Sequence, residues 1–283
     1  MRKVLIFGST GMIGHVVYNY LASLNKYRLI GSTINNKISE ETILLDIRNS
    51  EKIKDYLKIL KPDYVINCAG LLIAESEGNV EDALLINSLF PNVLSRLGKK
   101  LNFKLIQMST DCVFSGKKGN YTEESVPDGN NIYARTKMLG EINNKRDLTI
   151  RTSTIGPELK INGTGLLHWF LKQRGKINGF DNVFWTGVTT LELAKAIDEF
   201  IIQDISGLYH LVPKNKISKY ELLKILSEVW GRDDIEVCPC SDYPLDKSLL
   251  NSRQDFNYPT IDYKEMIVEL QDWVLSHQDL YSY

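Results

Sequence analysis

The first fourteen residues most constrain the fold of this chain, because they join a short apolar run to three evenly spaced glycines. Residues 4–7 read VLIF, and residues 8–14 read GSTGMIG. A continuous apolar run that ends in glycine is typical of a buried parallel strand. Apolar residues then recur at helical spacing between positions 13 and 24. This stretch therefore predicts a strand, a tight turn and a helix, which together open an α/β fold.

The first half of the chain repeats this alternation of strand and helix. Pro62 should stop the helix before it, and Pro91 should kink or restart another. Alternating strands and helices predict a Rossmann-like, doubly wound parallel sheet. We expect its further strands at residues 28–33, 42–47, 64–70, 104–110 and 148–153, and helices at residues 53–60, 80–100 and 131–144.

The glycine spacing predicts a dinucleotide site. Gly8, Gly11 and Gly14 follow the pattern G-x-x-G-x-x-G. Glycines at these places permit a tight turn and a close approach of the backbone to a pyrophosphate, which the free N–H groups of the next helix then bind. Three glycines alone also fit an ordinary loop, but their place between a strand and a helix favours the dinucleotide.

The end of the second strand bears on which dinucleotide binds. An acidic residue there would hold the ribose hydroxyls of NAD, and residues 31–37 contain none. They offer hydroxyl and amide groups such as Thr33, and they end in Lys37, which suits a 2′-phosphate. We therefore expect NADP(H), with NAD(H) as the alternative. Asp46 and Ile47 follow the third strand and are candidates for the adenine edge, although Asp46 equally fits a helix N-cap.

A second motif, YARTK, predicts acid–base chemistry. Tyr133 and Lys137 are four residues apart, so they share one face of the expected helix. A nearby ammonium would lower the pKa of the phenol and make Tyr133 a usable acid or base. The same spacing also occurs on ordinary solvated helix faces. Thr110 favours the catalytic interpretation, because it ends the preceding strand, where its hydroxyl could share a substrate oxygen with Tyr133.

Composition argues against several classes of partner. Lys and Arg number 34 against 35 Asp and Glu, and no basic stripe is present, so we expect neither nucleic acid nor a membrane surface. No apolar run approaches the roughly 20 residues of a membrane span, and the N-terminal run is too short for a signal peptide. Four cysteines do not make a disulfide framework, which favours a cytoplasmic location. Cys238 and Cys240 lack a second ligand pair, so we expect no metal.

These motifs resemble those of the extended short-chain dehydrogenases/reductases, and more closely the dTDP-4-dehydrorhamnose reductase branch of nucleotide-sugar 4-ketoreductases. The resemblance covers most of residues 1–158. Segments TSTIGPEL and GLLHWFL are similar to bacterial reductases of UDP-4-keto-6-deoxy-HexNAc sugars, and GVTTLELAKAI and LLNSRQDF are looser matches. The matching segments are GSTGMIG, LLDIRN, KPDYVINCAG, INSLFPN, STDCVFSGKKGNYTEES, IYARTKMLGE and LTIRTSTIGPE.

The resemblance implies a role for each matching residue. Tyr133 would protonate the forming C4 alkoxide, Lys137 would hold the nicotinamide ribose and tune Tyr133, and Thr110 would orient the keto oxygen. NADPH would deliver hydride to C4 and give a 6-deoxy-L-hexose nucleotide for surface glycans. The implied cofactor-binding residues are Gly8, Thr10, Gly11, Met12, Ile13 and Gly14 at the pyrophosphate, Cys68, Ala69 and Gly70 on the ribose side, and Asn87 near the cofactor.

Cys112 is a departure from the rhamnose reductases, which usually carry tyrosine at that place. Bifunctional epimerase/4-reductases of the branch carry cysteine there, as the proposed acid–base for epimerisation at C3. His168 and Lys172 are candidates for the second group of such a step. Cys112 equally fits a small packing residue, and His168 a solvated helix face. Arg253 suits either the substrate diphosphate or a structural ion pair.

The resemblance also implies two domains and two further functions. Residues 1–155, with a returning segment at about 181–205, would bind NADP, and residues 156–180 and 206–283 would form a smaller substrate-binding lobe. One alternative function is reduction of dTDP- or UDP-4-keto-rhamnose. The other is a non-catalytic NADP-binding regulatory subunit similar to the methionine adenosyltransferase β subunit. We expect a monomer or a homodimer with a nucleotide-sugar ligand.

Overall fold

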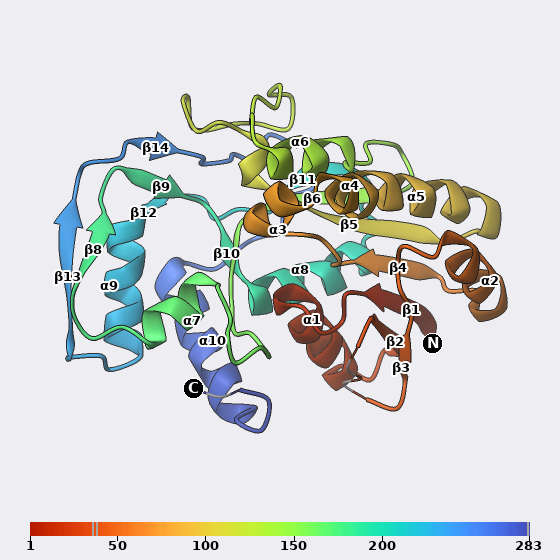
Figure 1. Ribbon diagram of the computed structural model, residues 1–283, viewed down its shortest axis with the longest axis horizontal. Helices are drawn as coiled ribbons and strands as arrows, with labels where there is room; N and C mark the ends of the chain where they lie inside the picture. Colours follow the sequence, from red (N-terminus) through yellow and green to blue (C-terminus); the bar gives the residue numbers. More distant parts are fainter. Residues whose placement is uncertain (36, 38, 282) are drawn as a thin grey trace.

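The computed structural model describes residues 1–35, 37, 39–281 and 283, and its centre is a parallel sheet of seven strands. The strand order is β11-β6-β5-β4-β1-β2-β3, so the chain runs outward from β1 in both directions. The predicted doubly wound α/β fold is therefore confirmed (Figure 1). The strands are β1 Arg2–Phe7, β2 Tyr27–Thr33, β3 Thr42–Leu44, β4 Tyr64–Asn67, β5 Lys104–Thr110, β6 Leu148–Thr152 and β11 Gly207–His210.

Helices cover both faces of the sheet because its strands are apolar on both sides. Val4 and Ile6 of β1 belong to a core formed with α1 (Met12–Ser23) and α8 (Thr190–Ile202). The alternate residues Leu5 and Phe7 belong to a second core, formed with α2 (Ser50–Leu60) and α5 (Phe90–Leu101). All four β1 side chains are fully buried. This two-sided burial explains the continuous apolar run near the N-terminus.

The expected helix at residues 80–100 forms in three parts. It begins as α4 (Val80–Ala83), widens into a π-helical turn at Leu84–Leu89, and continues as α5. Pro91 is the second residue of α5 and directly follows the π-helical turn, where it has no N–H to donate to the preceding turn, so it marks the change from π-helix to α-helix. The shorter helix α3 (Ile73–Gly78) precedes this stretch.

Three elements are clearly shorter than the sequence predicts. Strand β4 ends at Asn67 instead of residue 70. The edge strand β3 ends at Leu44, because its only neighbour β2 ends at the paired Thr33. Helix α6 spans Ile132–Leu139 instead of 131–144. It stops at Gly140, where a Cβ would lie 1.9 Å from the Asn87 carbonyl oxygen, so the backbone of α6 passes very close to the π-helical turn.

A small lobe lies beside the sheet, at the left of Figure 1. Its strands pair only with one another, β8 with β13, and β9 with both β12 and β14. The short strands β7 (Thr154–Ile155) and β10 (Val188–Thr189) pair between the sheet and this lobe. The lobe contains β8 Gly175–Phe180, β9 Val183–Trp185, β12 Ile217–Ser218, β13 Ile235–Cys240 and β14 Leu245–Asp246, with α7 Leu166–Leu171, α9 Lys219–Val229 and α10 Tyr263–Ser276.

The structure corrects the expected domain boundaries. The returning segment was placed at about 181–205, but β9 at Val183–Trp185 belongs to the small lobe. The return begins with β10 and runs through α8 to β11, which adds to β6 in register from Gly207 to His210. Four residues are too short a run to distinguish a sheet strand from an irregular segment by periodicity.

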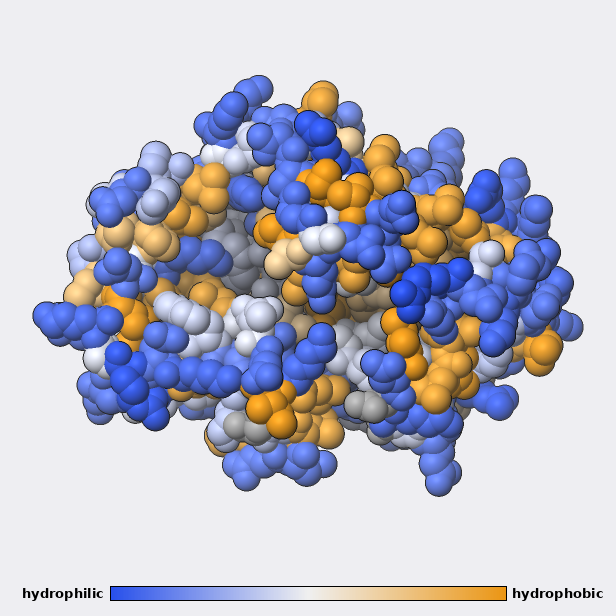
Figure 2. Space-filling model, viewed as in Figure 1, coloured by the Kyte–Doolittle hydropathy of each residue, from blue (hydrophilic) through white to orange (hydrophobic). Residues whose placement is uncertain are grey.

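The surface and the side-chain inventory add two observations. The face in Figure 2 is mainly hydrophilic, with apolar side chains in separate groups, and it is hollowed between the small lobe and the sheet region. In the part of the chain that the structure describes, no helix combines the length and apolar character needed to cross a membrane. The described residues also contain no cluster of three or more His, Cys, Asp or Glu suited to a metal ion.

Candidate active site

The glycine turn adopts the geometry that its spacing predicts. Gly8 has φ +72°, a value that favours glycine, and its carbonyl accepts a hydrogen bond from the N–H of Gly11 at 2.9 Å. A Cβ on Gly14 would lie 2.1 Å from the same carbonyl oxygen, so only glycine lets α1 start this close to the turn. Gly11 caps α1 without a side-chain hydrogen bond. The first N–H groups of α1 are therefore available to an anion.

A cavity of about 900 Å³ opens beside this turn and contains most of the predicted cofactor residues. Gly8, Thr10 and Gly11 line its floor, together with Cys68, Ala69 and Gly70 after β4. Thr33, Lys37 and Ile47 line the end where an adenosine would lie. The cavity is also lined by Leu159–Asn162, a loop segment after β7 that the sequence did not indicate as part of the site. No local pattern marks that segment, because only the fold carries it over the cavity.

The far end of the cavity suits a phosphorylated ribose. The hydroxyls of Thr10 and Thr33 lie 3.0 Å apart, which joins the glycine turn to the end of β2. Among the described residues that line the cavity there is no aspartate or glutamate, whereas Lys37 and Lys160 both line it. A wall of hydroxyl, amide and ammonium groups is what a 2′-phosphate requires.

Asp46 fits neither of its two expected roles. Its carboxylate accepts hydrogen bonds from the Arg48 side chain at 2.8 to 3.1 Å, and the Arg48 guanidinium lowers the pKa of Asp46. Asn49 caps α2 instead, and its side chain accepts from the N–H of Lys52. Leu45 and Ile47 line the cofactor cavity, but Asp46 does not. The carboxylate is instead held by Arg48, in the turn between β3 and α2.

Asn87, which the resemblance placed near the cofactor, acts through the backbone beside it. Its side-chain oxygen accepts from the N–H of Leu71 at 2.9 Å, and its amide donates to the Leu71 carbonyl at 3.1 Å. These bonds hold the turn that presents Gly70 to the cavity. Met12 and Ile13, also expected at the pyrophosphate, lie in the first turn of α1 and do not line the cavity. Gly14 lets the start of α1 pack directly against the Gly8 carbonyl.

The structure brings the predicted catalytic group together at the end of β5. Thr110 is the last residue of β5, and Tyr133 and Lys137 lie on the adjacent α6. The Thr110 side chain lies close enough to Tyr133 to lower the pKa of its phenol, against the larger opposite effect of burial, so the two hydroxyls are neighbours. The ammonium of Lys137 donates to the Met108 carbonyl at 2.7 Å and is only 7% exposed. This group lies at the carboxyl edge of the sheet, as does the cofactor cavity.

The pKa of Tyr133 shifts in the direction opposite to the one that the sequence predicts. Lys137 was expected to lower the pKa of Tyr133, but its ammonium turns to the Met108 carbonyl. Burial instead raises the pKa of Tyr133, and the neighbouring Cys112 and Asp111 raise it further. Burial lowers the pKa of Lys137 to about 8. Tyr133 is therefore a protonated phenol at neutral pH, which suits a proton donor.

Cys112 also lies in this group as a protonated thiol. Burial and the neighbouring Asp111 raise the pKa of Cys112 to about 11, and Lys247 donates to its sulfur at 3.5 Å. Thr110 accepts from the N–H of Cys112 and donates to Asp111, both at 3.1 Å. Burial raises the pKa of the Asp111 carboxyl. Cys112 therefore lies within reach of the reacting group instead of in an apolar core.

His168 and Lys172 lie elsewhere. His168 is 1% exposed on α7, and its Nδ1 lies 3.2 Å from the Tyr283 hydroxyl. Lys172 donates to the Ile161 carbonyl at 3.1 Å. Both residues therefore support the loop that flanks the cofactor cavity. The structure does not bring them to Tyr133, because α7 packs beside the glycine turn instead of over β5.

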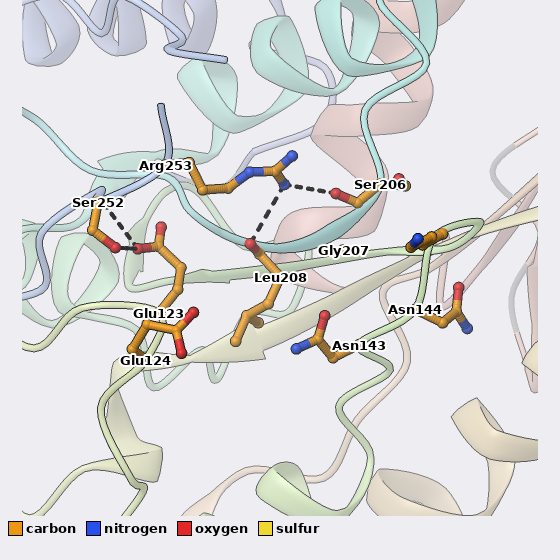
Figure 3. Close-up of a pocket in the computed structure, with 10 residues that line it drawn as sticks. Glu123, Glu124, Asn143, Asn144, Ser206, Gly207, Leu208, Ser252 and Arg253 are labelled. Carbon is orange, nitrogen blue, oxygen red and sulfur yellow. Dashed lines mark hydrogen bonds between the residues drawn. The ribbon is translucent and has the colours of Figure 1, made fainter. Parts of the chain in front are cut away.

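Arg253 is a structural residue at the opposite edge of the sheet. Its guanidinium donates to the carbonyls of Ser206 and Leu208 (Figure 3) and pairs with Asp255. Gly207 pairs with Leu148 at the amino ends of β11 and β6, whereas Thr110 pairs with Thr152 at the carboxyl ends. Arg253 therefore lies about four strand residues, roughly 13 Å, from the catalytic edge. Of the two roles expected for Arg253, the structure shows the ion pair, with Asp255.

A doubly wound sheet with a glycine-turn cavity and a Thr/Tyr/Lys group at its carboxyl edge defines the class of extended short-chain dehydrogenases/reductases. Within this class, the chain belongs to the family described as RmlD substrate binding domain, whose model matches residues 1–249. The match covers the whole sheet, the glycine turn and the catalytic group.

The chain is similar to curated proteins of two kinds. The dTDP-4-dehydrorhamnose reductase of Escherichia coli (strain K12) is 26% identical over 269 residues, which cover 91% of this chain and 85% of the relative. Methionine adenosyltransferase 2 subunit beta of Xenopus tropicalis is 25% identical over 258 residues, 86% of this chain and 77% of the relative.

Solved structures confirm the fold. The dTDP-4-dehydrorhamnose reductase of Bacillus anthracis in complex with NADP superposes with a TM-score of 0.83 at 21% identity, over 96% of this chain and 100% of that chain. A dTDP-4-dehydrorhamnose reductase from Clostridium acetobutylicum gives a TM-score of 0.81 at 23% identity, over 96% and 99%. The small lobe is thus part of the common fold.

Proposed function

We propose that this chain reduces the C4 keto group of a nucleotide-linked 4-keto-6-deoxy sugar with NADPH. The observation that carries the proposal is the protonated Tyr133 beside Thr110 at the sheet edge, next to a dinucleotide cavity that is lined by Lys37 and has no acidic residue among its described lining. The reductases among the relatives act on sugars of this class by name.

The residues divide the work as follows. When bound, NADPH supplies the hydride. The hydroxyls of Thr110 and Tyr133 hold the keto oxygen, and Tyr133 gives its proton to the alkoxide that forms at C4. Lys137, fixed by the Met108 carbonyl, presents its ammonium to the ribose next to Gly70, since a Cβ there would lie 3.8 Å from its Nζ. The N–H groups at the start of α1 bind the pyrophosphate.

The finer part of the proposal concerns the sugar. We infer UDP-2-acetamido-2,6-dideoxy-hexos-4-ulose as the preferred substrate, on the similarity of residues 152–159 and 165–171 to reductases of such sugars. Cys112 supports a further step at C3, because a keto group acidifies the neighbouring C–H and a protonated thiol can return a proton. In this step a water molecule on the opposite face of the sugar takes the original C3 proton, Cys112 gives its thiol proton to C3, and the thiolate is then reprotonated from solvent, since burial keeps the thiol in its protonated form.

The test is the oxidation of NADPH with freshly generated UDP-4-keto-6-deoxy-HexNAc, beside dTDP-4-keto-6-deoxyglucose. Turnover of the acetamido sugar supports the proposal, and turnover of the thymidine sugar alone moves the protein to rhamnose synthesis. Product NMR in D2O shows whether deuterium enters C3, and Cys112→Ser should abolish that exchange while C4 reduction continues.

The relatives named methionine adenosyltransferase 2 subunit beta favour one other function, a non-catalytic NADP-binding subunit. Tight NADPH binding without oxidation by any keto sugar would support that function and overturn the reductase. The hydroxyl pair of Tyr133 and Thr110 does not distinguish the two functions, because the binding subunits are expected to keep a similar group, so the keto-sugar assay decides between them.

A further inference from the structure

Two lysines of the small lobe face the catalytic turn. Lys247 follows β14, and its Nζ lies 3.5 Å from the sulfur of Cys112. Lys219 is the first residue of α9, and its Nζ lies 4.5 Å from the centroid of the Trp185 ring. Neither residue belongs to the catalytic group predicted from the sequence. Both come from the small lobe, and Lys247 contacts the catalytic turn at Cys112.

Mutual electrostatic effects place both lysines beside Asp111. Their positive charges counteract the effect of burial on the pKa of the Asp111 carboxyl, with Lys247 contributing more. In return, Asp111 and Cys112 counteract the desolvation of Lys219, which lowers its pKa to about 8. Charges are screened less in a partly buried site than in water, so Lys219, Lys247, Asp111 and Cys112 influence one another electrostatically, and Lys247 contacts Cys112 directly. Tyr133 adjoins these side chains through Cys112 and Asp111.

The backbone fixes both lysines firmly. Ser218 and Glu221 form a capping box that sets the start of α9 at Lys219. Tyr121 donates to the Ser248 carbonyl at 2.9 Å and accepts from the N–H of Leu250 at 2.7 Å, which ties the segment after Lys247 to the loop beyond the catalytic turn.

The helix itself gains nothing from Lys219. A cation in the first turn opposes the helix dipole, and burying it adds a desolvation cost. Lys224 on the same helix is exposed, as lysines usually are. A half-buried lysine at this place is therefore not explained by the stability of α9.

The donor capacity of the two lysines is largely unused. Each ammonium has three N–H donors and no acceptor. Among the residues that the structure describes, Lys219 contacts a ring face and Lys247 contacts a thiol sulfur, which is a weak acceptor. Most of these N–H donors are therefore open to a ligand that binds beside Cys112. A ligand rich in oxygen acceptors would satisfy them.

We propose that Lys219 and Lys247 form a cationic clamp that binds the oxygen substituents of the sugar beside its keto carbon, and thereby determine which sugar is accepted. The clamp rests on the proposed function and adds its specificity-determining residues. Bound sugar oxygens replace the ring face and the thiol as partners of the two ammonium groups. Asp111 balances their charge when the site is empty of sugar.

The test compares Lys219→Met and Lys247→Met with Lys224→Met, an exposed lysine on the same helix. Each clamp variant should raise the KM for the keto sugar by about tenfold or more, because a charged hydrogen bond is lost, with a smaller change in kcat. The Kd for NADPH, measured by fluorescence, should stay the same in all three. Lys224→Met should leave KM within twofold of the wild type.

A pH series separates binding from a structural role. The KM of the wild type should rise above pH 8, as the Lys219 ammonium loses its proton. Lys219→Arg should remove this rise, because a guanidinium stays charged. The other groups facing Lys219 are Asp111, Cys112 and Lys247, and burial raises the pKa of Cys112 to about 11. Because burial also lowers the pKa of Lys137 to about 8, the comparison with Lys219→Arg is what assigns the rise in KM to Lys219.

The outcomes distinguish the clamp from the function on which it rests. If the wild type reduces keto sugars and both clamp variants keep its KM, the clamp is wrong and the function stands. If the wild type reduces none, the function is wrong, and calorimetry with UDP-N-acetylglucosamine and NADP⁺ tests the clamp alone. Equal affinity of Lys219→Met and wild type then overturns the clamp. Thermal melts and Lys219→Arg control for misfolding.

Discussion

Lys137 in the sheet domain and Lys219 in the small lobe both have a lowered pKa, but different neighbours surround them. Burial lowers the pKa of each to about 8. Lys137 is held by the Met108 carbonyl of its own domain, whereas Lys219 meets a tryptophan face and the charges of the other domain. We therefore expect the lysine of the sheet domain to hold the cofactor and the lysine of the small lobe to bind the sugar. The following predictions test that division.

The largest effect should come from Tyr133→Phe, which removes the proton donor and keeps the ring. We expect kcat to fall by about a thousandfold, since general acid catalysis contributes 10²–10⁴-fold. The Kd for NADPH should stay the same, which places the loss in the chemical step. Tyr56→Phe on α2 is the matched control and should change neither quantity. Full activity of Tyr133→Phe would move the acid role to the small lobe and break the comparison.

Gly14→Ala should mainly weaken cofactor binding. The added Cβ would lie 2.1 Å from the Gly8 carbonyl oxygen, so the glycine turn must move. Overpacking of this kind costs about 1–3 kcal/mol, which corresponds to roughly a ten- to hundredfold rise in the Kd for NADPH. Gly78→Ala is the control, because a Cβ there meets no heavy atom within 4 Å. An unchanged Kd for Gly14→Ala would show that the pyrophosphate binds elsewhere.

Mild acid should destabilise the fold through His15. Its Nδ1 lies 2.8 Å from the Gly11 carbonyl oxygen and its Nε2 lies 3.0 Å from the Tyr281 hydroxyl, and burial lowers its pKa from 6.5 to about 4. Between these values the unfolded chain binds the additional proton, so stability falls as the pH falls from 6.5 toward 4. His15 should contribute about 2 kcal/mol of this loss at pH 5.

Chemical denaturation at pH 7 and pH 5 measures this loss. His15→Asn should reduce the difference between the two pH values, while the lowered pKa of His210 on β11 leaves part of it in place. A wild type that is equally stable at both pH values would contradict the prediction and show that this junction between α1 and the segment after α10 does not depend on a neutral imidazole.

Arg253→Met should have the smallest effect. It removes the hydrogen bonds to the Ser206 and Leu208 carbonyls at the amino edge of the sheet, so we expect a loss of about 1 kcal/mol in the free energy of unfolding. The KM for the nucleotide sugar should not change, in contrast to the clamp variants. A raised KM with normal stability would restore the diphosphate role that the structure does not support.

Local spacing accounts for what the sequence could predict. The glycine turn, the end of β5 at Thr110 and the shared helix of Tyr133 and Lys137 depend on neighbours within a few residues, so the sequence could predict them, whereas the ends of β3 and β4 depend on neighbouring strands and were predicted too far along the chain. Lys219 and Lys247 could not be found in this way, because their position depends on how the small lobe packs on the sheet. The direction of the Tyr133 pKa was wrong for the same reason, since burial is a tertiary property.

The π-helical turn at Leu84–Leu89 has a consequence for how the length of this chain can vary. Such a turn contains one residue more than an α-helical turn, and Asn87 reaches the Leu71 backbone from within it. Deleting one residue from this segment would restore a regular α-helix and remove the extra residue that lets Asn87 reach Leu71. The strand-end loop would then lose its support. Segment 84–89 should therefore tolerate changes at its exposed residues Leu84 and Leu89, but no deletion.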